Sequence, residues 1–342
     1  MPVIRIGPHE IDARACLAPM SGVSDAPFRQ LAVRLGAPLV VSEMVASEGL
    51  CTGNEEMQLK AQSAGCGLHV VQIAGRESVW MAEATRRLVD SGADIIDINM
   101  GCPARKVTNG YSGSALMREP DHALDLVDST VAAAGAVPVT LKMRLGWDHG
   151  SLNAPEIARR AVDAGVQAIT VHGRTRCQFY KGEADWHAVR AVRDAVDVPL
   201  TVNGDITDLD TANQALEASG ADLVMVGRGS YGRPWAIGEI DKGLKGETPD
   251  APPSRVEIGQ IASEHYQDLL SHYGLRIGLR AARKHLGWYL DSAFGAGLEK
   301  RDPVYAELRR KVLTKADPKD VLRALSACLE HDEDVAKLEV AA

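Results

Sequence analysis

The chain has 342 residues, of which 45% are hydrophobic and 25% are charged, a composition typical of a globular protein. No uncharged apolar stretch approaches the roughly 18 residues of a membrane span, so we expect no membrane association and a cytoplasmic location. The formal net charge of -8 argues against a generic nucleic-acid-binding protein, which needs clustered Lys and Arg, so any such binding must be local.

Short apolar, β-branched runs recur along the first two thirds of the chain and predict eight strands. They lie at residues 16–20, 39–44, 69–74, 95–100, 138–143, 168–173, 199–204 and 222–227. Apolar residues spaced three or four apart predict helices between most of them, at 79–91, 123–134, 155–164, 186–195 and 210–219. Eight such units within residues 1–245 predict an α/β fold, a (β/α)8 TIM barrel, which uses roughly 250 residues.

The working residues of such a barrel follow the carboxyl ends of its strands. A single polar residue there is usually structural, but here all eight predicted strands end in polar residues or glycine. In chain order these are Pro19, Met20 and Ser21; Glu43; Gln72; Asn99 and Cys102; Lys142 and Arg144; His172 and Arg174; Asn203, Gly204 and Asp205; and Gly227, Arg228 and Gly229. The pattern predicts a functional site at this rim.

Cys102 follows a buried strand directly, in the segment Asp97-Ile98-Asn99-Met100-Gly101-Cys102-Pro103. A free thiol has a pKa near 8.5, so it is mostly protonated at neutral pH and suits proton donation. A cysteine in a turn is more often a small buried hydrophobe, but the polar neighbours of Cys102 favour chemistry. The six cysteines form no C-x-x-C pair, so we expect no metal site and free thiols; Cys177, in the loop after strand six, has no assigned role.

The loop after strand eight, Gly227-Arg228-Gly229-Ser230-Tyr231-Gly232, matches G-x-G-x-x-G. A dinucleotide fingerprint opens a βαβ unit, whereas this loop closes the series, so that interpretation is weak. TIM barrels commonly bind phosphate in the loops after strands seven and eight. The loop therefore predicts a phosphorylated ligand.

The C-terminal third begins with a proline-rich linker at residues 246–254. Ser254 with Glu257 forms a capping-box pattern, and Asp302 and Asp317 each precede a proline, as helix caps do. About four helices in a small bundle are predicted. The expected domains are a catalytic barrel at 1–245, the linker, a helical domain at 255–335 and a tail at 336–342.

One predicted helix of this bundle carries a basic stripe. Arg276, Arg280, Arg283 and Lys284 are spaced to share one face, and residues 255–315 hold 11 basic and 7 acidic residues, a net of +4. A basic stripe is usually a solvated face, but two further features favour nucleic-acid binding. They are the adjacent aromatic residues Trp288 and Tyr289 and the rim arginines Arg144, Arg174 and Arg176.

Taken together, the motifs resemble those of the flavin-dependent tRNA-dihydrouridine synthases and are most similar to the B-type bacterial branch. The similarity runs through the whole chain. The motifs are Ala18-Pro19-Met20, Asp25-Ala26-Pro27-Phe28-Arg29, Ser42-Glu43-Met44, Gln72-Ile73-Ala74-Gly75, the cysteine segment, Lys142, His172-Gly173-Arg174-Thr175-Arg176, Asn203-Gly204-Asp205, Gly227-Arg228, and Arg283-Lys284-His285 with Trp288-Tyr289.

The resemblance implies FMN in the barrel mouth, NADPH rather than NADH as reductant, and a uridine of the tRNA D-loop as substrate. Pro19, Met20 and Ser21 would border the flavin, with Gln72 and Lys142 at its polar edge. The phosphate would lie among His172, Asn203, Gly204, Asp205, Gly227 and Arg228. Cys102 would give a proton to uracil C5 as hydride reaches C6, with Asn99 and Arg144 facing the substrate.

Other functions remain open on sequence grounds. A flavin oxidoreductase of free pyrimidines or dihydroorotate would not need the basic helical domain. A non-catalytic RNA-binding regulator on a barrel scaffold would be expected to lack Cys102 or Lys142, and both are present. A flavin-free phosphosugar enzyme is a weaker possibility. No obligate protein partner is indicated.

Overall fold

The computed structural model describes residues 3–331. Within them the chain forms two compact units, residues 3–230 with 235–249 and residues 231–234 with 250–331. The predicted domain bounds, 1–245, 246–254 and 255–335, stay a prediction. The predicted tail at 336–342 and the last four residues of the predicted helical domain lie outside the described residues.

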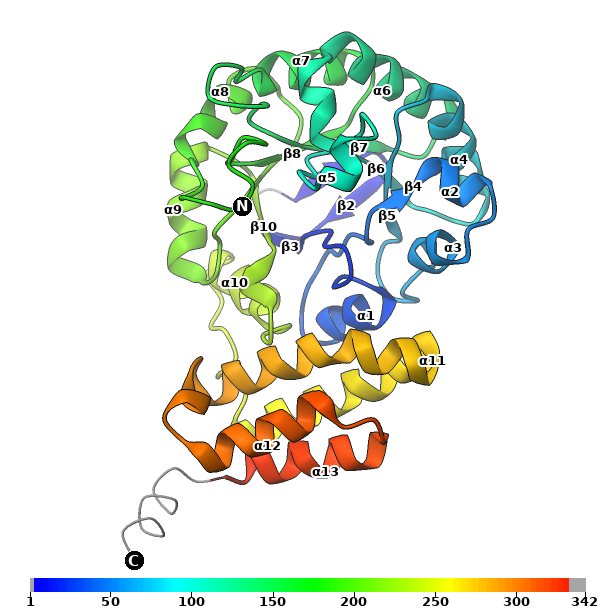
Figure 1. The fold of residues 1–342 in the computed structure, drawn as a ribbon. Helices are drawn as coiled ribbons and strands as arrows, with labels where there is room; N and C mark the ends of the chain where they lie inside the picture. Colours follow the sequence, from blue (N-terminus) through cyan, green and yellow to red (C-terminus); the bar gives the residue numbers. More distant parts are fainter. Residues whose placement is uncertain (1–2, 332–342) are drawn as a thin grey trace, which may run out of the picture. The chain divides into compact units, whose positions relative to one another are not determined.

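The first unit is a parallel eight-stranded barrel surrounded by helices (Figure 1), which confirms the predicted fold. The strand order is β3-β10-β9-β8-β7-β6-β5-β4. Single parallel bridges from Leu17 to Val40 and from Val41 to Val70 join the two ends. The strands are β3 (Ala15–Leu17), β4 (Val45–Ala46), β5 (Val70–Ala74), β6 (Ile95–Met100), β7 (Val139–Arg144), β8 (Ala168–His172), β9 (Leu200–Asn203) and β10 (Leu223–Val226).

The helices of this unit largely follow the predicted periodicity. They are α1 (Ala26–Arg34), α2 (Ser47–Cys51), α3 (Glu55–Ala61), α4 (Ser78–Asp90), α5 (Arg105–Thr108), η1 (Gly113–Arg118), α6 (Pro120–Ala134), α7 (Ala154–Asp163), η2 (His187–Val189), α8 (Arg190–Arg193), α9 (Leu209–Ser219), η3 (Arg228–Ser230) and α10 (Ala236–Leu244). The predicted helix at 186–195 is wrong in form, since a 3-10 turn and a four-residue helix replace it.

The second strand of the barrel is interrupted, so the prediction of a continuous strand at 39–44 is wrong. Val41 pairs with Val70 and Val45 with Ile73, which gives four steps on one strand against three on the other. The extra residue makes a bulge, and bulges re-aim side chains next to functional sites. Glu43 lies in this bulge and is fully buried.

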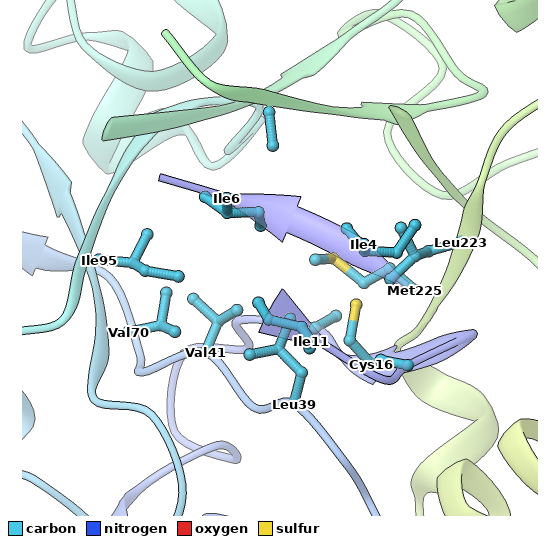
Figure 2. Packing of buried hydrophobic residues seen from close by; sticks show 13 residues of the cluster. Ile4, Ile6, Ile11, Cys16, Leu39, Val41, Val70, Ile95, Leu223 and Met225 are labelled. Carbon is cyan, nitrogen blue, oxygen red and sulfur yellow. The ribbon is translucent and has the colours of Figure 1, made fainter. Parts of the chain in front are cut away.

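Alternate residues of the strands point into the barrel, because side chains alternate with a period of two. The interior at the amino end of the barrel holds Val70, Ile95 and Leu223. These residues line a small cavity together with Asp97, Thr140 and Thr201. A hairpin that the sequence did not reveal, β1 (Ile4–Ile6) and β2 (His9–Ile11), packs its isoleucines against these residues (Figure 2). Its three-residue strands are too short for a periodic signal. The hairpin closes the amino end, so ligands can enter only at the carboxyl end.

The second unit consists of α11 (Arg255–Phe294), η4 (Leu298–Lys300), α12 (Pro303–Thr314) and α13 (Pro318–Leu329). Gly274 has φ 70° and ψ 166° and divides α11 into two helices, which gives the four helices expected. The capping box of Ser254 and Glu257 is present, and Asp302 and Asp317 both cap as predicted. Along residues 3–331, no helix combines the length and apolar character of a membrane span.

Candidate active site at the carboxyl end of the barrel

Five inward-facing polar residues meet in the upper barrel, as the strand ends predicted. Gln72, Asn99, Lys142, His172 and Asn203 come from five consecutive strands, and each is less than 10% exposed. The Asn99 amide donates to Gln72 Oε1 at 2.7 Å, and Lys142 Nζ donates to Asn203 Oδ1 at 3.1 Å. The barrel therefore holds a connected polar layer at the base of its open end.

Cys102 lies on the loop directly above this layer. Its backbone N–H donates to Asn99 Oδ1 at 3.0 Å, and its carbonyl accepts from the Ser114 hydroxyl at 2.8 Å. Gly113, with φ 60°, approaches so closely that a Cβ would lie 2.9 Å from that carbonyl. The thiol itself is partly exposed and makes no hydrogen bond within residues 3–331. The loop is thus held by its backbone while the thiol stays available.

Lys142 is a buried lysine whose charge is finely balanced. Burial, followed by the nearby charge of Arg144, lowers its pKa from 10.5 to about 8. Asp97, Cys16 and Cys102 act in the opposite direction. A lysine with this pKa can change protonation with small changes in its surroundings, including the arrival of an anion.

Positive charge converges on His172. Burial lowers the pKa of its imidazole well below 6.5, and the charges of Arg144, Lys142, Arg174 and Arg228 lower it further. The ring is therefore neutral at neutral pH and can donate or accept a hydrogen bond. Four cations around one neutral ring form an electrostatic environment that fits an anionic group such as a phosphate.

Gly204 gives this region the close backbone approach expected of a phosphate loop. Its φ is 117°, and a Cβ there would lie 2.8 Å from His172 Cδ2. Gly229 is similarly constrained, since a Cβ would lie 2.4 Å from the carbonyl of Ile206. These positions require glycine for packing, and they leave backbone beside the cations. The donor set fits a phosphate group.

The structure corrects the role expected for Asp205. Its carboxylate accepts from Arg174 at 2.5 and 2.9 Å, from Arg228 at 3.2 Å and from the Ala184 backbone at 2.8 Å. Burial opposes ionisation, but these hydrogen bonds and charges lower its pKa below 3.8. An ionised carboxylate repels phosphate, so the Asp205 side chain does not bind it, and only the backbone of Asp205 stays a predicted phosphate contact. The side chain instead orients two arginines of the site.

Two of the three rim arginines are not exposed as expected. Arg144 and Arg174 are each 1% exposed. Arg144 donates to the carbonyls of Gly101, Thr175 and Phe179, and Arg174 donates to Asp205 and to loop carbonyls. These acceptors hold Nε and Nη1 of Arg144 and the whole guanidinium of Arg174, so neither side chain is free to extend to an RNA backbone. Their contact with the substrate stays a prediction.

Arg176 is half-buried and remains at the surface. Its guanidinium lies over the rings of Trp147 and Phe179, with distances of 4.5 and 4.7 Å to the ring centroids. Exposed Arg118 lies over the same Trp147 ring at 4.0 Å. The rim thus has an arginine and aromatic cluster suited to nucleotides. No sequence pattern indicated the roles of Trp147 and Arg118, because they come from separate loops.

The residues expected to border the flavin ring lie at the end of β3. Pro19 and Met20 are half-buried and Ser21 is exposed. The neighbouring Gly22 N–H donates to Glu43 Oε1, and Lys60 Nζ lies 3.9 Å from the same oxygen. The other oxygen of Glu43 is buried without a partner in the described part of the chain. Glu43 therefore anchors this loop from the bulged second strand.

In the second unit the basic stripe is exposed at three of its four positions. Arg276, Arg280 and Arg283 make no hydrogen bond or ion pair with the residues that the structure describes. Lys284 is half-buried and donates to the Ala281 carbonyl at 3.2 Å. Leu275, which follows the break at Gly274, is 57% exposed.

The aromatic neighbours of the stripe differ from the expectation. Tyr289 is 1% exposed and its hydroxyl lies 3.1 Å from His265 Nδ1, so it belongs to the core of the unit. Trp288 stacks on Tyr231, with centroids 3.9 Å apart. Tyr289 is therefore not available to RNA bases.

No cluster of metal-ligating side chains occurs within residues 3–331.

The geometry is that of a barrel with a cluster of cationic residues and an available thiol at its open end. Residues 16–330 match the family model described as "Dihydrouridine synthase (Dus)". The chain is 53% identical over 319 residues to a probable tRNA-dihydrouridine synthase of Rhizobium leguminosarum, covering 93% of this chain and 95% of that protein. It is 46% identical over 298 residues to tRNA-dihydrouridine synthase B of Pseudomonas aeruginosa, with 86% and 89% covered.

This chain therefore belongs to the dihydrouridine synthase family, which confirms the resemblance drawn from the motifs. It is a flavin-dependent oxidoreductase with tRNA as its substrate. Solved structures add the fold alone. Histamine dehydrogenase from Rhizobium aligns with a TM-score of 0.52 at 14% identity over 78% of this chain and 50% of that one. An amine oxidase from Pseudomonas geniculata gives 0.53 at 13% identity over 78% and 52%.

Proposed function

We propose that this enzyme uses FMN and NADPH to reduce the C5–C6 double bond of a uridine in the D-loop of tRNA, with Cys102 as the proton donor. The single observation that carries the proposal is the placement of the Cys102 thiol. It is free, partly exposed and held by backbone hydrogen bonds directly above the polar layer of the barrel.

FMN is the flavin that fits this chain best, because the cations around His172 suit a single terminal phosphate. Arg228 and the backbone at Gly204, Gly227 and Asn203 would hold that phosphate, and Lys142 and Gln72 would face the isoalloxazine edge. When bound, FMN supplies the hydride that reaches uracil C6. A cation at Lys142 favours the negative charge of a reduced flavin.

The residues of the chain then supply the proton and the geometry. Cys102 gives its proton to C5 on the face opposite the hydride, and the thiolate is later reprotonated from solvent. Arg144 is the last residue of β7. Its Nε donates to the Gly101 carbonyl and so holds the Cys102 loop from the other side. The target uracil must leave its stack to reach the barrel, as enzymes that act on bases require.

The helical unit supplies the surface that a small-pyrimidine oxidoreductase would lack. Arg276, Arg280 and Arg283 are exposed on one helix face and have no partner within residues 3–331. Charge of this kind binds phosphates without sequence preference. We propose that this face, together with Arg176 of the barrel, contacts the tRNA backbone.

The test of the mechanism is Cys102→Ala. We expect the variant to keep its FMN and to be bleached by NADPH as the parent is, because the thiol acts only on the uracil. Its tRNA reduction should fall roughly 10²- to 10⁴-fold, the usual effect of a positioned general acid. Single-turnover absorbance measurements separate the two steps. Parental tRNA reduction in this variant would contradict the assigned role.

The site of modification needs its own measurement. We expect tRNA from a strain without the gene to lack dihydrouridine at one or more D-loop positions, and mass-spectrometric nucleoside mapping identifies them. Complementation with the parent gene should restore the modification, and complementation with Cys102→Ala should not. Loss of dihydrouridine outside the D-loop would refute the proposed substrate position while leaving the enzyme class intact.

A further inference from the structure

A chain of hydrogen-bonded side chains runs from the barrel interior to the Cys102 loop. The Thr140 hydroxyl donates to Asp97 Oδ1 at 2.6 Å, and the Gln72 amide donates to Asp97 Oδ2 at 2.7 Å. The Asn99 amide then donates to Gln72 Oε1 at 2.7 Å. Asn99 Oδ1 finally accepts from the backbone N–H of Cys102 at 3.0 Å.

The direction of every bond in this chain follows from its first acceptor. An ionised carboxylate only accepts, so the Gln72 NH2 must point to Asp97 and its oxygen must point away. Asn99 must then turn its NH2 to Gln72 and its oxygen to the loop. If both amides turned round, the Asn99 NH2 would face the donating N–H of Cys102, and that bond would be lost.

Burial makes the reversal of these amide orientations costly. Asp97, Gln72 and Asn99 are 5%, 1% and 7% exposed, so water cannot readily replace a missing partner. A buried donor or acceptor that loses its partner carries the full cost of its lost hydration. Burial raises the pKa of Asp97, and the hydrogen bonds from Thr140 and Gln72 and the charge of Lys142 offset only part of that rise. The direction of the chain rests on the geometry, because Oδ2 of Asp97 accepts from the Gln72 amide while Oδ1 faces the Thr140 hydroxyl.

We propose that Asp97 is a positioning residue that fixes the amide orientations of Gln72 and Asn99 and so holds the Cys102 loop in its working geometry. Asp97 does not touch the substrate. It acts through two amides on the backbone that carries the thiol. The inference rests on the proposed function of Cys102, and the experiment below separates the two.

The variant that tests it is Asp97→Asn. The introduced amide has one donor group, its NH2, and one acceptor, its oxygen. It therefore no longer forces the direction of the hydrogen bonds from position 97 to Cys102. A second variant combines Asp97→Asn with Gln72→Glu and exchanges the amide and the carboxylate. The carboxylate at position 72 then accepts both from position 97 and from Asn99, which restores the direction at Asn99. Thr201→Val is the matched control, because Thr201 lines the same interior cavity but makes no hydrogen bond to this chain of side chains.

Two readouts are needed for each variant. The first is the alkylation rate of Cys102 by iodoacetamide, followed by peptide mass spectrometry, which reports on the loop without any catalysis. The second is the pair of single-turnover rates, flavin reduction by NADPH and flavin oxidation by tRNA. FMN content and melting temperature are recorded alongside.

For Asp97→Asn we expect an altered alkylation rate, unchanged flavin reduction, and tRNA-dependent oxidation slowed by about tenfold or more, as displaced reacting groups cause. The exchange variant should move the alkylation rate back towards the parental value, and Thr201→Val should match the parent. Parental alkylation and oxidation in Asp97→Asn would overturn the inference. A parallel fall of the flavin-reduction rate, the flavin-oxidation rate and the melting temperature, without recovery in the exchange variant, would also overturn it. That pattern indicates general damage to the structure.

A different result would separate the two proposals. If alkylation changes in Asp97→Asn and recovers in the exchange variant, while Asp97→Asn and Cys102→Ala both reduce tRNA at the parental rate, then Asp97 positions the loop as inferred. In that case the proton-donor role of Cys102 is what fails. If Cys102→Ala loses tRNA reduction but Asp97→Asn behaves as the parent in both readouts, the proposed function stands and the positioning role is wrong.

Discussion

Two sets of positive charge in this enzyme are arranged in opposite ways. At the barrel rim, Arg144 and Arg174 are buried and their donors are taken by backbone carbonyls and Asp205. On the long helix of the second unit, Arg276, Arg280 and Arg283 are exposed and have no partner within residues 3–331. Buried charge that is held by hydrogen bonds shapes a specific site. Exposed charge without a protein partner suits binding that does not depend on sequence, such as contact with an RNA backbone.

The largest effect expected from this contrast is that of Arg174→Ala. Removing the guanidinium leaves Asp205 with Arg228 as its one cationic partner within residues 3–331 and removes a charge from the predicted phosphate site. We expect the free energy of unfolding to fall by about 3 kcal/mol, the scale for a broken buried ion pair. The purified protein should also lose FMN, which its absorbance spectrum reports.

Arg176→Ala is the matched control, because Arg176 is half-buried and its guanidinium lies over two aromatic rings. Its stability loss should be smaller, about 1 kcal/mol, and its FMN content should be parental. Equal losses in the two variants would mean that burial does not distinguish them.

The next effect is on tRNA affinity. Replacing Arg276, Arg280 and Arg283 together by alanine should weaken tRNA binding and flatten its salt dependence by about 0.7 to 0.9 in log–log slope for each tRNA phosphate that is no longer neutralised. Because these side chains are exposed, stability should change by less than about 0.5 kcal/mol. Binding measured at three salt concentrations, with a melting curve, tests both statements.

Arg310→Ala provides the control in the same unit. Arg310 is also exposed, but it is paired with Glu307 at 2.7 Å, so it is not a cation without a protein partner. We expect its tRNA affinity and salt slope to be parental. If the triple variant also keeps the parental slope, the stripe is a solvated face and the barrel rim becomes the RNA-binding surface.

A smaller effect concerns Lys142 and pH. Since its pKa is about 8 in the free protein, the cation is present below that pH and is lost as pH rises through it. The affinity of the apoprotein for FMN should therefore decline above pH 8. Lys142→Met should bind more weakly and show no such decline, while Lys142→Arg should keep its charge and its affinity across the range. A parental pH dependence in Lys142→Met would assign the titration to another group.

The last prediction tests whether burial also lowers a pKa in the helical unit. Burial, then His265 and Lys284, lowers the pKa of His285 well below 6.5. The unfolded chain takes up a proton below pH 6.5 and the folded chain does not, so stability is present above that pH and falls below it. The fall should reach about 1.4 kcal/mol for each pH unit. Urea unfolding at pH 7.5 and 5.5 measures it, and His285→Gln should reduce the fall. An undiminished fall in that variant would exclude His285.

The architecture and the residues at the strand ends could be predicted from local patterns in the sequence. Apolar runs of strand length and helical periodicity predicted the eight units, and the polar strand ends predicted Gln72, Asn99, Lys142, His172 and Asn203 at one rim. These predictions succeeded because a parallel barrel gathers every strand's carboxyl end at one rim. The helix caps at Ser254, Asp302 and Asp317 were equally local and equally predictable.

Which charges are buried, and which hydrogen bonds they make, depends on how the strands and loops pack together. Arg144 and Arg176 look alike in the sequence, yet one is enclosed by loop carbonyls and the other lies on aromatic rings. Asp205 became a partner of two arginines, and Asp97 became the start of a hydrogen-bonded chain to Cys102. Burial and hydrogen-bond direction depend on residues from other strands and loops, far away along the chain, so no local pattern encodes them.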